Sequence, residues 1–599
     1  MTSDRDFFAR KSSEYGSLIG QKEKSSRLMS AERLVLFIIA AVSAVVGLKD
    51  DKPVILTVGI IFFVLFVALC FMHSNIKKEI RRAKALKDAA DLYLSRIDGK
   101  FEDLKITGEE YLDIRDDYSF DLDIFGKRSV YSLYVVSESK GGRKRFADEL
   151  SGKITDIDIK SRHEAVKELI EKKELLLEYQ AQGKIGKLDK PLTAIDNMCS
   201  EGRPLSSFAR MLIFIMPLFW LIPVASVFLF PKYKLLSVLS VLIIHLIVWF
   251  FISSRYANGF SGVDRLSRQT EAVFRQFLLI EKADLTAPGL RRLVKGGASS
   301  DKKASDAFSS LSFTCGVASL RSQPLFALIL NSVFPFDLLS YSLLSGWTEK
   351  YGNEARKSLD SLYEFEAVMC CTSPSLISSV STFPEVTDRT DDPSANAFFE
   401  GKDILHPLLD PSKAVSNSVT LHNDIALITG SNMSGKTTLI RTVGICAVLS
   451  YIGAPVPASE LRLGKMRVIS SMRIVDDLGE EMSTFKAELI RISKIVDASR
   501  EGRPLLFLID EIFRGTNSAD RTEGALVVLQ NLYKPYITGM MTTHDYALCD
   551  KVESRIDKIV YYHFSEKYND TGISFDYKLH PGVSHESNAA FLMKLVGIT

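Results

Sequence analysis

Cysteine is scarce in this sequence. Seven of the 599 residues are cysteine, an odd number, and no two form a C-x-x-C pair. A disulfide framework is therefore excluded, and the chain fits a reducing compartment with no disulfide partner. We assign a functional role to none of them: Cys70, Cys199, Cys315, Cys370, Cys371, Cys446 and Cys549.

Net charge is also small. Lys and Arg number 75 against 73 for Asp and Glu, a net of +2, so no field of the whole chain attracts nucleic acid, and any basic patch must be local. With 25% charged and 46% hydrophobic residues, the composition excludes a mostly disordered or collagenous chain. At about 150 residues per domain the length predicts about four folding units, which excludes a single small binding module.

Long apolar runs, in contrast, are present, and the mean hydropathy is slightly positive at +0.08. Four uncharged runs form two close pairs, each predicted as a helical hairpin: 34–48 with 54–72, and 211–230 with 235–252. The last three runs would reach roughly 27 to 30 Å as helices, enough to cross a bilayer. The first reaches only about 22 Å and needs snorkelling flanks or a thinned bilayer. Buried helices of a large soluble core are the alternative, which the pairing disfavours.

Basic residues surround the first pair of runs and indicate its orientation. They precede the first run (Arg5, Arg10, Lys11, Lys22, Lys24, Arg27, Arg33) and follow the second (Lys77, Lys78, Arg81, Arg82, Lys84, Lys87). By the positive-inside rule both flanks face the cytoplasm. We expect a multi-pass membrane protein with its N-terminus and large segments in the cytoplasm. The second basic group favours anionic lipid headgroups over DNA phosphates.

The patterning divides the chain into five regions. We predict an N-terminal region with the first hairpin (1–95), the first part of a helical core (96–205), the second hairpin (206–256), the second part of the core (257–395) and a final α/β domain (396–599). A segment rich in Asp, Thr and Pro, 384–397, reads as a linker into the last domain.

The most specific motif in the chain is a G-x-x-x-x-G-K-[ST] loop. Chance gives about 0.02 such matches in a chain of this length. An apolar strand (425–428) precedes it and a helical run (439–451) follows, as in a P-loop. We expect the loop to bind ATP, with Lys436 on the phosphates and Thr437 on Mg²⁺. The nucleotide-binding residues are Gly430, Ser431, Asn432, Met433, Ser434, Gly435, Lys436, Thr437 and Thr438.

Two acidic residues end a second apolar strand. Leu505 to Ile509 read as a buried parallel strand, and Asp510 and Glu511 follow directly. We expect Asp510 to hold the Mg²⁺ shell and Glu511 to take a proton from the attacking water. A third strand, 536–541, leads to His544, which could contact the γ-phosphate; a lone His there would more often be structural. The predicted enzyme is a Mg²⁺-dependent ATP hydrolase.

These motifs, in this order, resemble the MutS family of DNA mismatch-repair ATPases, relatives of the ABC nucleotide-binding fold. The segment 429–438, TGSNMSGKTT, is similar to the family's TGPNMGGKST loop, and DEIFRGTN at 510–517 resembles DEIGRGTS, with Phe513 in place of a glycine. DDL at 476–478 followed by STF at 483–485 is similar to a further family segment. The resemblance implies that Ser483 and Asp520 contact the partner subunit of a homodimer.

Upstream, the resemblance is partial. Asp123 to Gly126 and Leu362 to Ala367 resemble the family's helical core and lever regions. Nothing ahead of residue 110 resembles the family's mismatch-reading domain. The expected fold is therefore multidomain, with two membrane helical hairpins, an α-helical MutS-like core and lever, and a C-terminal α/β P-loop ATPase of ABC-like type.

Two functional interpretations stay open. The first is a membrane-anchored MutS-like ATPase whose dimer switches its grip on a ligand as ATP is bound and hydrolysed, with double-stranded DNA implied by the resemblance alone. The second is an ABC-like membrane ATPase coupled to a protein, a lipid or a transported ligand. Transport itself is disfavoured because the external loops are short and the runs contain no intramembrane charge beyond His245.

Overall fold

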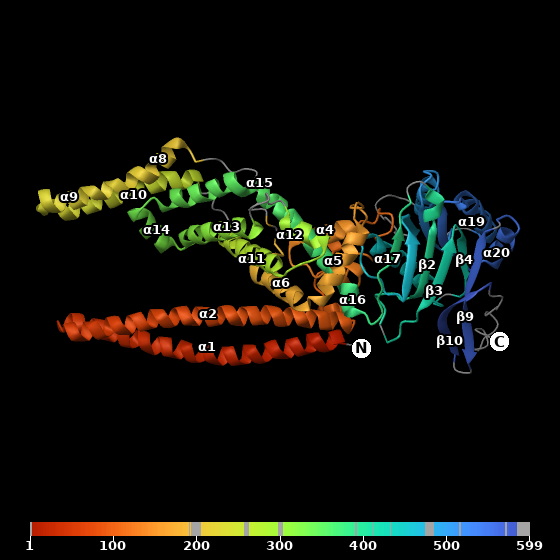
Figure 1. Ribbon diagram of the computed structural model, residues 1–599, viewed down its shortest axis with the longest axis horizontal. Helices are drawn as coiled ribbons and strands as arrows, with labels where there is room; N and C mark the ends of the chain where they lie inside the picture. The colour runs from red at the N-terminus through yellow and green to blue at the C-terminus, as the bar shows by residue number, and fades with distance from the viewer. Residues whose placement is uncertain are drawn as a thin grey trace.

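The computed structural model describes residues 3–190, 192, 205–256, 263–296, 303–389, 392–410, 412–431, 433–473, 484–513, 517–556, 558–569 and 572–583. It is an elongated molecule with helices at one end and a mixed α/β domain at the other (Figure 1). Asn432, Ser483, the DDL segment and everything after Val583 lie outside the described residues.

Two long antiparallel helices form the N-terminal region, α1 (Ser3–Lys49) and α2 (Pro53–Ile97). The predicted apolar runs are only the distal halves of these helices, which meet at the turn 50–52. Their polar halves are joined by ion pairs, including Lys22 with Glu79 at 2.6 Å and Lys84 with Glu23 at 2.7 Å. Three members of the basic group after the second run, Arg82, Lys84 and Lys87, thus bind carboxylates of this chain.

Glycine residues allow α1 and α2 to approach each other closely in the apolar half of the hairpin. A Cβ atom added to Gly47 of α1 would lie 2.8 Å from the backbone nitrogen of Leu56 in α2, and one added to Gly59 would lie 3.2 Å from that of Ala44. Small residues let apolar helices approach until their backbones touch. The hairpin is therefore held by backbone packing where its outer face is most apolar.

The second hairpin is less regular than the sequence predicts. The run 211–230 is divided into α8 (Ser207–Ile215), the 3₁₀ segment η3 (Met216–Trp220) and α9 (Leu221–Leu229). Pro217 lies in η3 and Pro223 in α9, and each lacks the amide hydrogen of a continuous helix. The return helix is α10 (Lys234–Tyr256), which follows the short turn η4 (Pro231–Tyr233).

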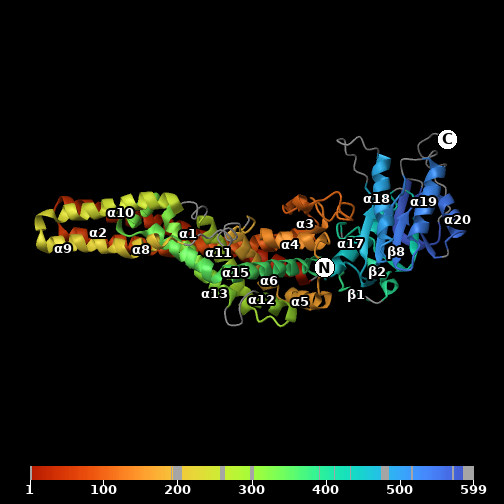
Figure 2. The same cartoon turned by 90° about the horizontal axis from the view of Figure 1, so that it is seen from above.

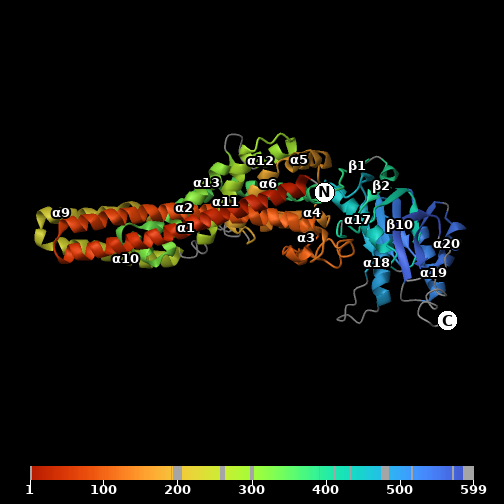
Figure 3. The ribbon, with the colours of Figure 1, turned by 90° about the horizontal axis from the view of Figure 1, so that it is seen from below.

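Both hairpins point away from the α/β domain (Figures 1 and 3). Four helical segments among the described residues are long and apolar enough to cross a membrane: Asp4–Lys49, Pro53–Ile97, Ser207–Leu229 and Pro231–Phe251. A fifth candidate is a pair of segments that meet at a bend of 106°, Ala304–Ser322 and Leu325–Val333.

The helical core lies between the hairpins and the α/β domain (Figure 2). It contains α3 (Val130–Tyr134), α4 (Lys140–Leu150), α5 (Ile159–Glu171), α6 (Lys173–Gly186), α11 (Val263–Lys282), α12 (Pro288–Lys295), α13 (Ala304–Ser319), α14 (Pro324–Val333), α15 (Phe336–Cys370) and α16 (Ser373–Ile377). Short 3₁₀ segments are η1 (Phe101–Asp103), η2 (Glu109–Tyr111) and η6 (Leu320–Ser322).

Helix α15 connects the two ends of the core and carries a buried carboxylate near each of its own ends. Asp337 accepts hydrogen bonds from Trp249 of α10 (2.9 Å), Arg321 (3.1 Å) and Asn331 (3.2 Å). Glu366, 0% exposed, accepts from Ser139 (2.6 Å), Ser137 and Tyr179 (3.1 Å). The first cluster ties α15 to the second hairpin, and the second ties it to the core beside the α/β domain.

The α/β domain contains two sheets. A four-stranded sheet has the order β1-β5-β2-β3, from β1 (Glu385–Thr387), β2 (Phe398–Ile404), β3 (Asn417–His422) and β5 (Glu460–Gly464), and η7 (Pro393–Asn396) precedes β2. Strand β1 pairs in parallel with β5, so this sheet begins ahead of residue 396, inside the segment predicted as a linker.

The second sheet has the order β10-β9-β4-β8-β7-β6. All neighbours pair in parallel except β9 with β10. Its strands are β4 (Ile425–Thr429), β6 (Arg467–Ser471), β7 (Leu505–Asp510), β8 (Ile537–Thr542), β9 (Ile559–Asn569) and β10 (Gly572–Pro581). Its helices are α17 (Lys436–Tyr451), α18 (Thr484–Ala498), α19 (Ser518–Leu532) and α20 (Tyr546–Glu553).

Alternation along β4 divides the hydrophobic core into two clusters. Ile425 and Leu427 pack with α18, α19 and α20, whereas Ala426 and Ile428 pack with α17. The cluster on the α17 side continues without a break through the helical core to Phe8 of α1. The α/β domain and the helical core therefore share one apolar interior, and neither packs as an independent unit.

Candidate nucleotide site

The carboxyl ends of β4, β7 and β8 bring the predicted site residues together. Parallel strands end at the same edge of a sheet, and β8 lies between β4 and β7. The loop after β4 turns directly into α17, whose first residue is Lys436. The three strands lie where the sequence predicts them. Because they are adjacent, Lys436 comes into one site with Asp510, 74 residues later, and with His544, 108 residues later.

Positive backbone angles shape the loop. Gly430 has φ of 139° and Gly435 of 114°, in the region that glycine adopts at little cost. A Cβ atom on Gly430 would approach the carbonyl oxygen of Phe564 to 3.1 Å. Met433 has φ of 71° and is 85% exposed at the tip. The two glycines thus allow the loop to curl back over the start of α17.

Lys436 lies inside this loop. Its Nζ atom donates to the carbonyl oxygens of Gly430 (2.7 Å) and Ser431 (2.6 Å), and the side chain is almost fully buried. The buried hydroxyl of Ser434 has no partner among the described residues. A desolvated ammonium group, an unpaired hydroxyl and the N-terminus of a sixteen-residue helix all favour an anion here. These residues fit a nucleotide phosphate.

Thr437 and Asp510 converge in the way a magnesium site requires. The Thr437 hydroxyl donates to Oδ2 of Asp510 at 2.8 Å, so two oxygen donors lie beside the phosphate loop. Mg²⁺ prefers oxygen ligands and is commonly held by one or two protein side chains together with substrate phosphates. Bound there, the metal would neutralise charge on the phosphate oxygens, and Thr437 and Asp510 would hold it.

Glu511 stands beside His544. Its carboxylate forms an ion pair with Nε2 of His544, and the same ring nitrogen lies 3.4 Å from Nζ of Lys436. Glu511 has φ of 53°, an uncommon conformation for a residue with a side chain, so the backbone at this point is strained. The structure therefore connects the proposed base, the histidine and the phosphate-binding lysine in one chain of contacts.

Thr542, a residue to which we gave no role from the sequence, joins the two acidic positions. Its hydroxyl donates to Oδ1 of Asp510 at 2.7 Å and accepts from the backbone N–H of Glu511 at 3.0 Å. The sequence showed only a threonine at the end of a strand. Its role depends on the pairing of β8 with β7, which places Thr542 opposite Asp510.

Phe513 occupies a backbone position typical of glycine. It has φ of 59°, and its N–H donates to the buried carboxylate of Glu488 in α18. The ring packs against Phe485 at 6.0 Å between centroids and against Gly524. Phe513 therefore adopts a left-handed backbone conformation and adds an aromatic contact between α18 and α19.

Asp520, predicted from the resemblance to contact a second subunit, lies exposed in the first turn of α19. Its carboxylate accepts from the side chain of Asn517 at 2.7 Å. Nothing in a single chain tests a contact with a partner subunit, so this assignment stays a prediction. Thr438 follows in α17, one residue beyond the phosphate loop.

A loop of the helical core that contains Asp121 and Asp123 binds arginine side chains of the α/β domain. Asp121 accepts two hydrogen bonds of 2.9 Å from Arg491 of α18, and Asp123 accepts from Arg441 of α17 at 2.9 Å and from Arg473 at 2.7 Å. Arg473 is the last described residue before the segment that contains DDL and Ser483. The core thereby contacts α17, which begins at the nucleotide loop, and α18.

Comparison with known proteins agrees with the site. The family described as MutS domain V matches residues 426–598, which contain the loop, both acidic residues and His544. In this domain the chain is similar to the MutS family. The chain is 32% identical to part of the DNA mismatch repair protein MutS of Natronomonas pharaonis over 199 residues, which are 32% of this chain and 23% of that protein.

Two further relatives match the same share of this chain. MutS 2 of Halobacterium salinarum is 30% identical over 199 residues, 32% of this chain and 23% of that protein. MutS of a Roseiflexus species is 30% identical over 203 residues, 32% of this chain and 18% of that protein. Both are described as DNA mismatch repair proteins. The chain thus spans less than a quarter of the length of these relatives.

Proposed function

We propose that the protein is a membrane-anchored ATP hydrolase of MutS type, in which ATP binding and hydrolysis switch a homodimer between states that grip a ligand differently. The observation that carries this proposal is the cluster formed by Lys436, Thr437, Asp510, Glu511 and His544. Each type of side chain needed for phosphoryl transfer to water is present once and within contact of the next.

In this proposal each side chain has a defined task. Lys436 would bind the phosphate oxygens in place of the loop carbonyls, and Thr437 and Asp510 would hold the metal, which would neutralise phosphate charge. Glu511 accepts a proton from the attacking water, and His544 orients that carboxylate and senses the terminal phosphate. Since His544 contacts both Glu511 and Lys436, it can report the occupancy of the phosphate loop to the base.

Membrane anchoring is supported by the exposed apolar surface at the end far from the nucleotide site. Large side chains there are largely exposed, including Leu48 (72%), Val54 (74%), Phe228 (80%) and Phe250 (72%). Water-exposed patches of this size are rare in soluble monomers. A bilayer around the distal halves of the hairpins would cover them, with the core and the ATPase domain in the cytoplasm.

Duplex DNA is the first candidate for the ligand, because the relatives with similar ATPase domains are DNA mismatch repair proteins. A second candidate is a protein or lipid partner at the membrane. It is favoured by α15, which reaches from the core beside the ATPase domain to the second hairpin through Glu366 and Asp337. Movement of the nucleotide site would then act on the membrane end.

The deciding experiment is steady-state ATP hydrolysis by the full chain in nanodiscs, with Glu511→Gln as the blank. We expect the variant to bind ATP and to hydrolyse it about 100 to 10,000 times more slowly. Rates are compared without DNA, with matched duplex and with mismatched duplex, at two salt concentrations. Full turnover by Glu511→Gln would refute the assignment of the base.

The DNA arms separate the two candidate ligands. A salt-sensitive change of rate with duplex would support DNA as the coupled ligand, because phosphate contacts weaken steeply with salt. A mismatch preference would support recognition by a part of the chain unlike the family's mismatch-reading domain. A rate that DNA does not change, but that still requires Glu511, would support the membrane or protein partner.

A further inference from the structure

Helix α14 presents an exposed apolar face beside α10 of the second hairpin, with which it is in contact (Figure 1). The helix contains no charged residue. Its opposite face, with Ala327 and Asn331, is buried. The large side chains of the exposed face, between 44% and 67% accessible, are Leu325, Phe326, Leu328, Ile329 and Val333. An apolar face of this kind indicates contact with a partner or a membrane.

The uncharged stretch extends beyond the helix, and the charges at its two limits neutralise each other. No Asp, Glu, Lys or Arg occurs from residue 322 to residue 336. Arg321 precedes this stretch and Asp337 follows it, and the two form an ion pair of 3.1 Å. Charged side chains at membrane depth pair with one another in this way. The stretch therefore brings no uncompensated charge with it.

The polar side chains within α14 find their hydrogen-bond partners inside the protein. The amide nitrogen of Asn331 donates to the carbonyl oxygen of Ala327 (2.9 Å) and to Asp337 (3.2 Å). The amide oxygen of Asn331 accepts from the backbone N–H of Asp337 at 3.0 Å. Ser332 donates to the carbonyl oxygen of Ile329 at 2.8 Å. Hydrocarbon offers no hydrogen bonds, so internal partners of this kind are what a helix in contact with lipid requires.

Contacts with both runs of the second hairpin set the depth of α14. Trp220, nine residues after the start of the first run, donates from Nε1 to the carbonyl oxygen of Val333 at 2.7 Å. Trp249, three residues before the end of the second run, donates to Asp337 at 2.9 Å. A bilayer that covers these runs therefore also surrounds the end of α14. At about 15 Å, the helix can enter one leaflet of a hydrocarbon core of roughly 30 Å but cannot cross it.

The chain enters and leaves this corner through the helical core. The segments Ala304–Ser322 and Leu325–Val333 meet at 106°, and α15 begins at Phe336, directly after α14. We propose that the stretch 322–336 is a re-entrant membrane element, which inserts into the cytoplasmic leaflet beside the second hairpin and places the exposed face of α14 against lipid acyl chains. This element rests on the membrane anchoring proposed above and is independent of ATP hydrolysis.

Site-directed spin labelling of the full chain, in nanodiscs of phosphatidylcholine and phosphatidylglycerol, tests this. A nitroxide is attached to Phe326→Cys or to Ile329→Cys, both on the exposed face of α14. Its accessibility to molecular oxygen, which partitions into lipid, is compared with its accessibility to a water-soluble nickel chelate. We expect oxygen accessibility to exceed nickel accessibility at both positions. Wild type labelled in the same way gives the background from the native cysteines.

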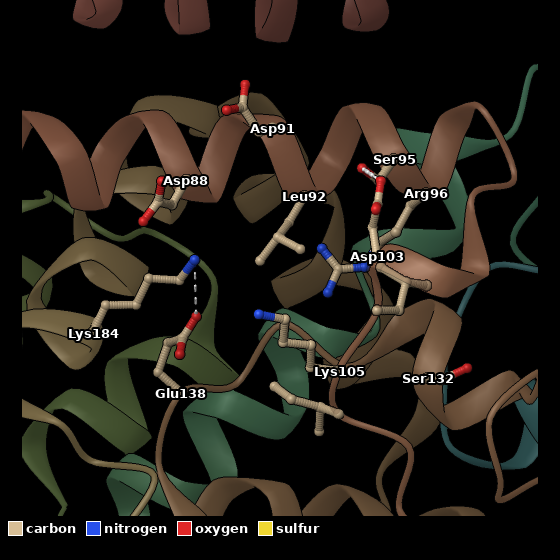
Figure 4. Close-up of a pocket in the computed structure, with 12 residues that line it drawn as sticks. Asp88, Asp91, Leu92, Ser95, Arg96, Asp103, Lys105, Ser132, Glu138 and Lys184 are labelled. Carbon is tan, nitrogen blue, oxygen red and sulfur yellow. Dashed lines mark hydrogen bonds and ion pairs between the residues drawn. The ribbon is translucent and has the colours of Figure 1, made fainter.

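Two further positions calibrate the measurement. Phe228→Cys reports the insertion of the second hairpin itself, since Phe228 is 80% exposed in α9. Lys105→Cys is the water-facing control, because Lys105 is exposed in a hollow of about 520 Å³ whose wall contains carboxylate and ammonium groups (Figure 4). Leu92 in the same wall is 20 residues beyond Met72, about 30 Å along α2 from the end of the apolar run. We expect the ratio of oxygen to nickel accessibility at Phe326 to be several-fold higher than at Lys105.

The result at Phe228 separates failure of the re-entrant element from failure of the membrane anchoring. Lipid exposure at Phe228 together with water exposure at Phe326 and Ile329 would overturn the re-entrant element and leave the anchoring in place. Low accessibility of both α14 labels to either reagent would show that protein, such as a second copy of the chain, covers this face, and would also overturn it. Water exposure at Phe228 would refute the anchoring and the re-entrant element together.

Discussion

Thr542 shows how one hydroxyl can set the geometry of two acidic groups. It donates to Asp510 and accepts from the backbone of Glu511, so it fixes the proposed metal ligand relative to the proposed base. An unmet hydrogen bond at a buried carboxylate costs about 1–3 kcal/mol, and the methyl group of valine cannot replace it. The position matters because phosphoryl transfer depends on alignment.

We therefore expect Thr542→Val to lower the turnover of ATP about 10- to 100-fold, with a smaller effect on nucleotide affinity. Steady-state kinetics and a separate binding titration measure the two quantities. Thr538→Val is the matched control, since Thr538 is also buried on β8 but donates to Asp424 away from the site. Equal losses in the two variants would show that only the strand was disturbed.

Glu366 gives a second prediction at the scale of one residue. Burial raises the pKa of its carboxyl, although three hydroxyl donors oppose this effect. The folded protein thus holds this proton more tightly than the unfolded chain does. Its contribution to stability is present at low pH and is lost as the pH rises from the ordinary pKa of about 4.5 through the raised value.

Gln at this position carries no charge to bury. We expect the melting temperature of Glu366→Gln, relative to wild type, to increase from pH 5 to pH 8, as followed by scanning fluorimetry in detergent. Glu364→Gln is the control on the same helix, where Glu364 pairs with Arg292 at 2.9 Å and is partly exposed. A difference between Glu366→Gln and wild type that stays constant with pH would contradict the argument.

At the scale of elements, α1 and α2 approach each other closely at Gly47 of α1 and Gly59 of α2. Gly47 leaves no room for a Cβ atom against Leu56, whereas a Cβ on Gly20 of the same helix would meet nothing within 4 Å. The two positions share a residue type and a helix but differ in their surroundings. Substitution at Gly20 therefore changes helix propensity alone, whereas substitution at Gly47 also changes the packing of α1 against α2.

We expect Gly47→Leu to force the helices apart at a cost of about 1–3 kcal/mol and to lower the melting temperature in detergent. Gly20→Leu should keep or slightly raise it, because leucine favours helix more than glycine does. The comparison needs only thermal unfolding of the two variants and wild type. A Gly47→Leu protein as stable as Gly20→Leu would show that α1 and α2 do not pack tightly.

Local sequence patterns predicted the helices and strands better than they predicted the contacts between them and the breaks within them. The loop 430–437 and the strand ending at Asp510 were found because motif and periodicity are local. The docking of Asp121 on Arg491, 370 residues away, and the cluster around Asp337 depend on contacts that no local pattern encodes. The break at η3 was missed because Pro217 lies inside an otherwise uniform apolar run.

At the scale of the whole molecule, the two hairpins end in turns at the same side, opposite the α/β domain (Figure 1). If both cross the bilayer, these turns lie on one side of it and the described residues of the helical core and the α/β domain lie on the other. Lys232 is in the second turn and is exposed, and Lys153 is exposed in the helical core. A cysteine at either position tests the topology.

We expect Lys232→Cys to react with a membrane-impermeant maleimide on intact cells, and Lys153→Cys to react only after the membrane is permeabilised. Wild type serves as the blank for the native cysteines, of which all but Cys70 are buried among the described residues. Labelling of Lys153→Cys on intact cells would reverse the orientation. Equal labelling of both in the soluble fraction would argue against membrane insertion.

The length of α15 has a mechanical consequence. Its 35 residues extend over about 52 Å, with Glu366 held near one end and Asp337 near the other. A rigid rod of that length that pivots by about 5° at the end beside the α/β domain displaces its opposite end by about 4.5 Å. Such a displacement approaches half the diameter of a helix, so a rotation too slight to disrupt the interior could still reposition α10 relative to its neighbours.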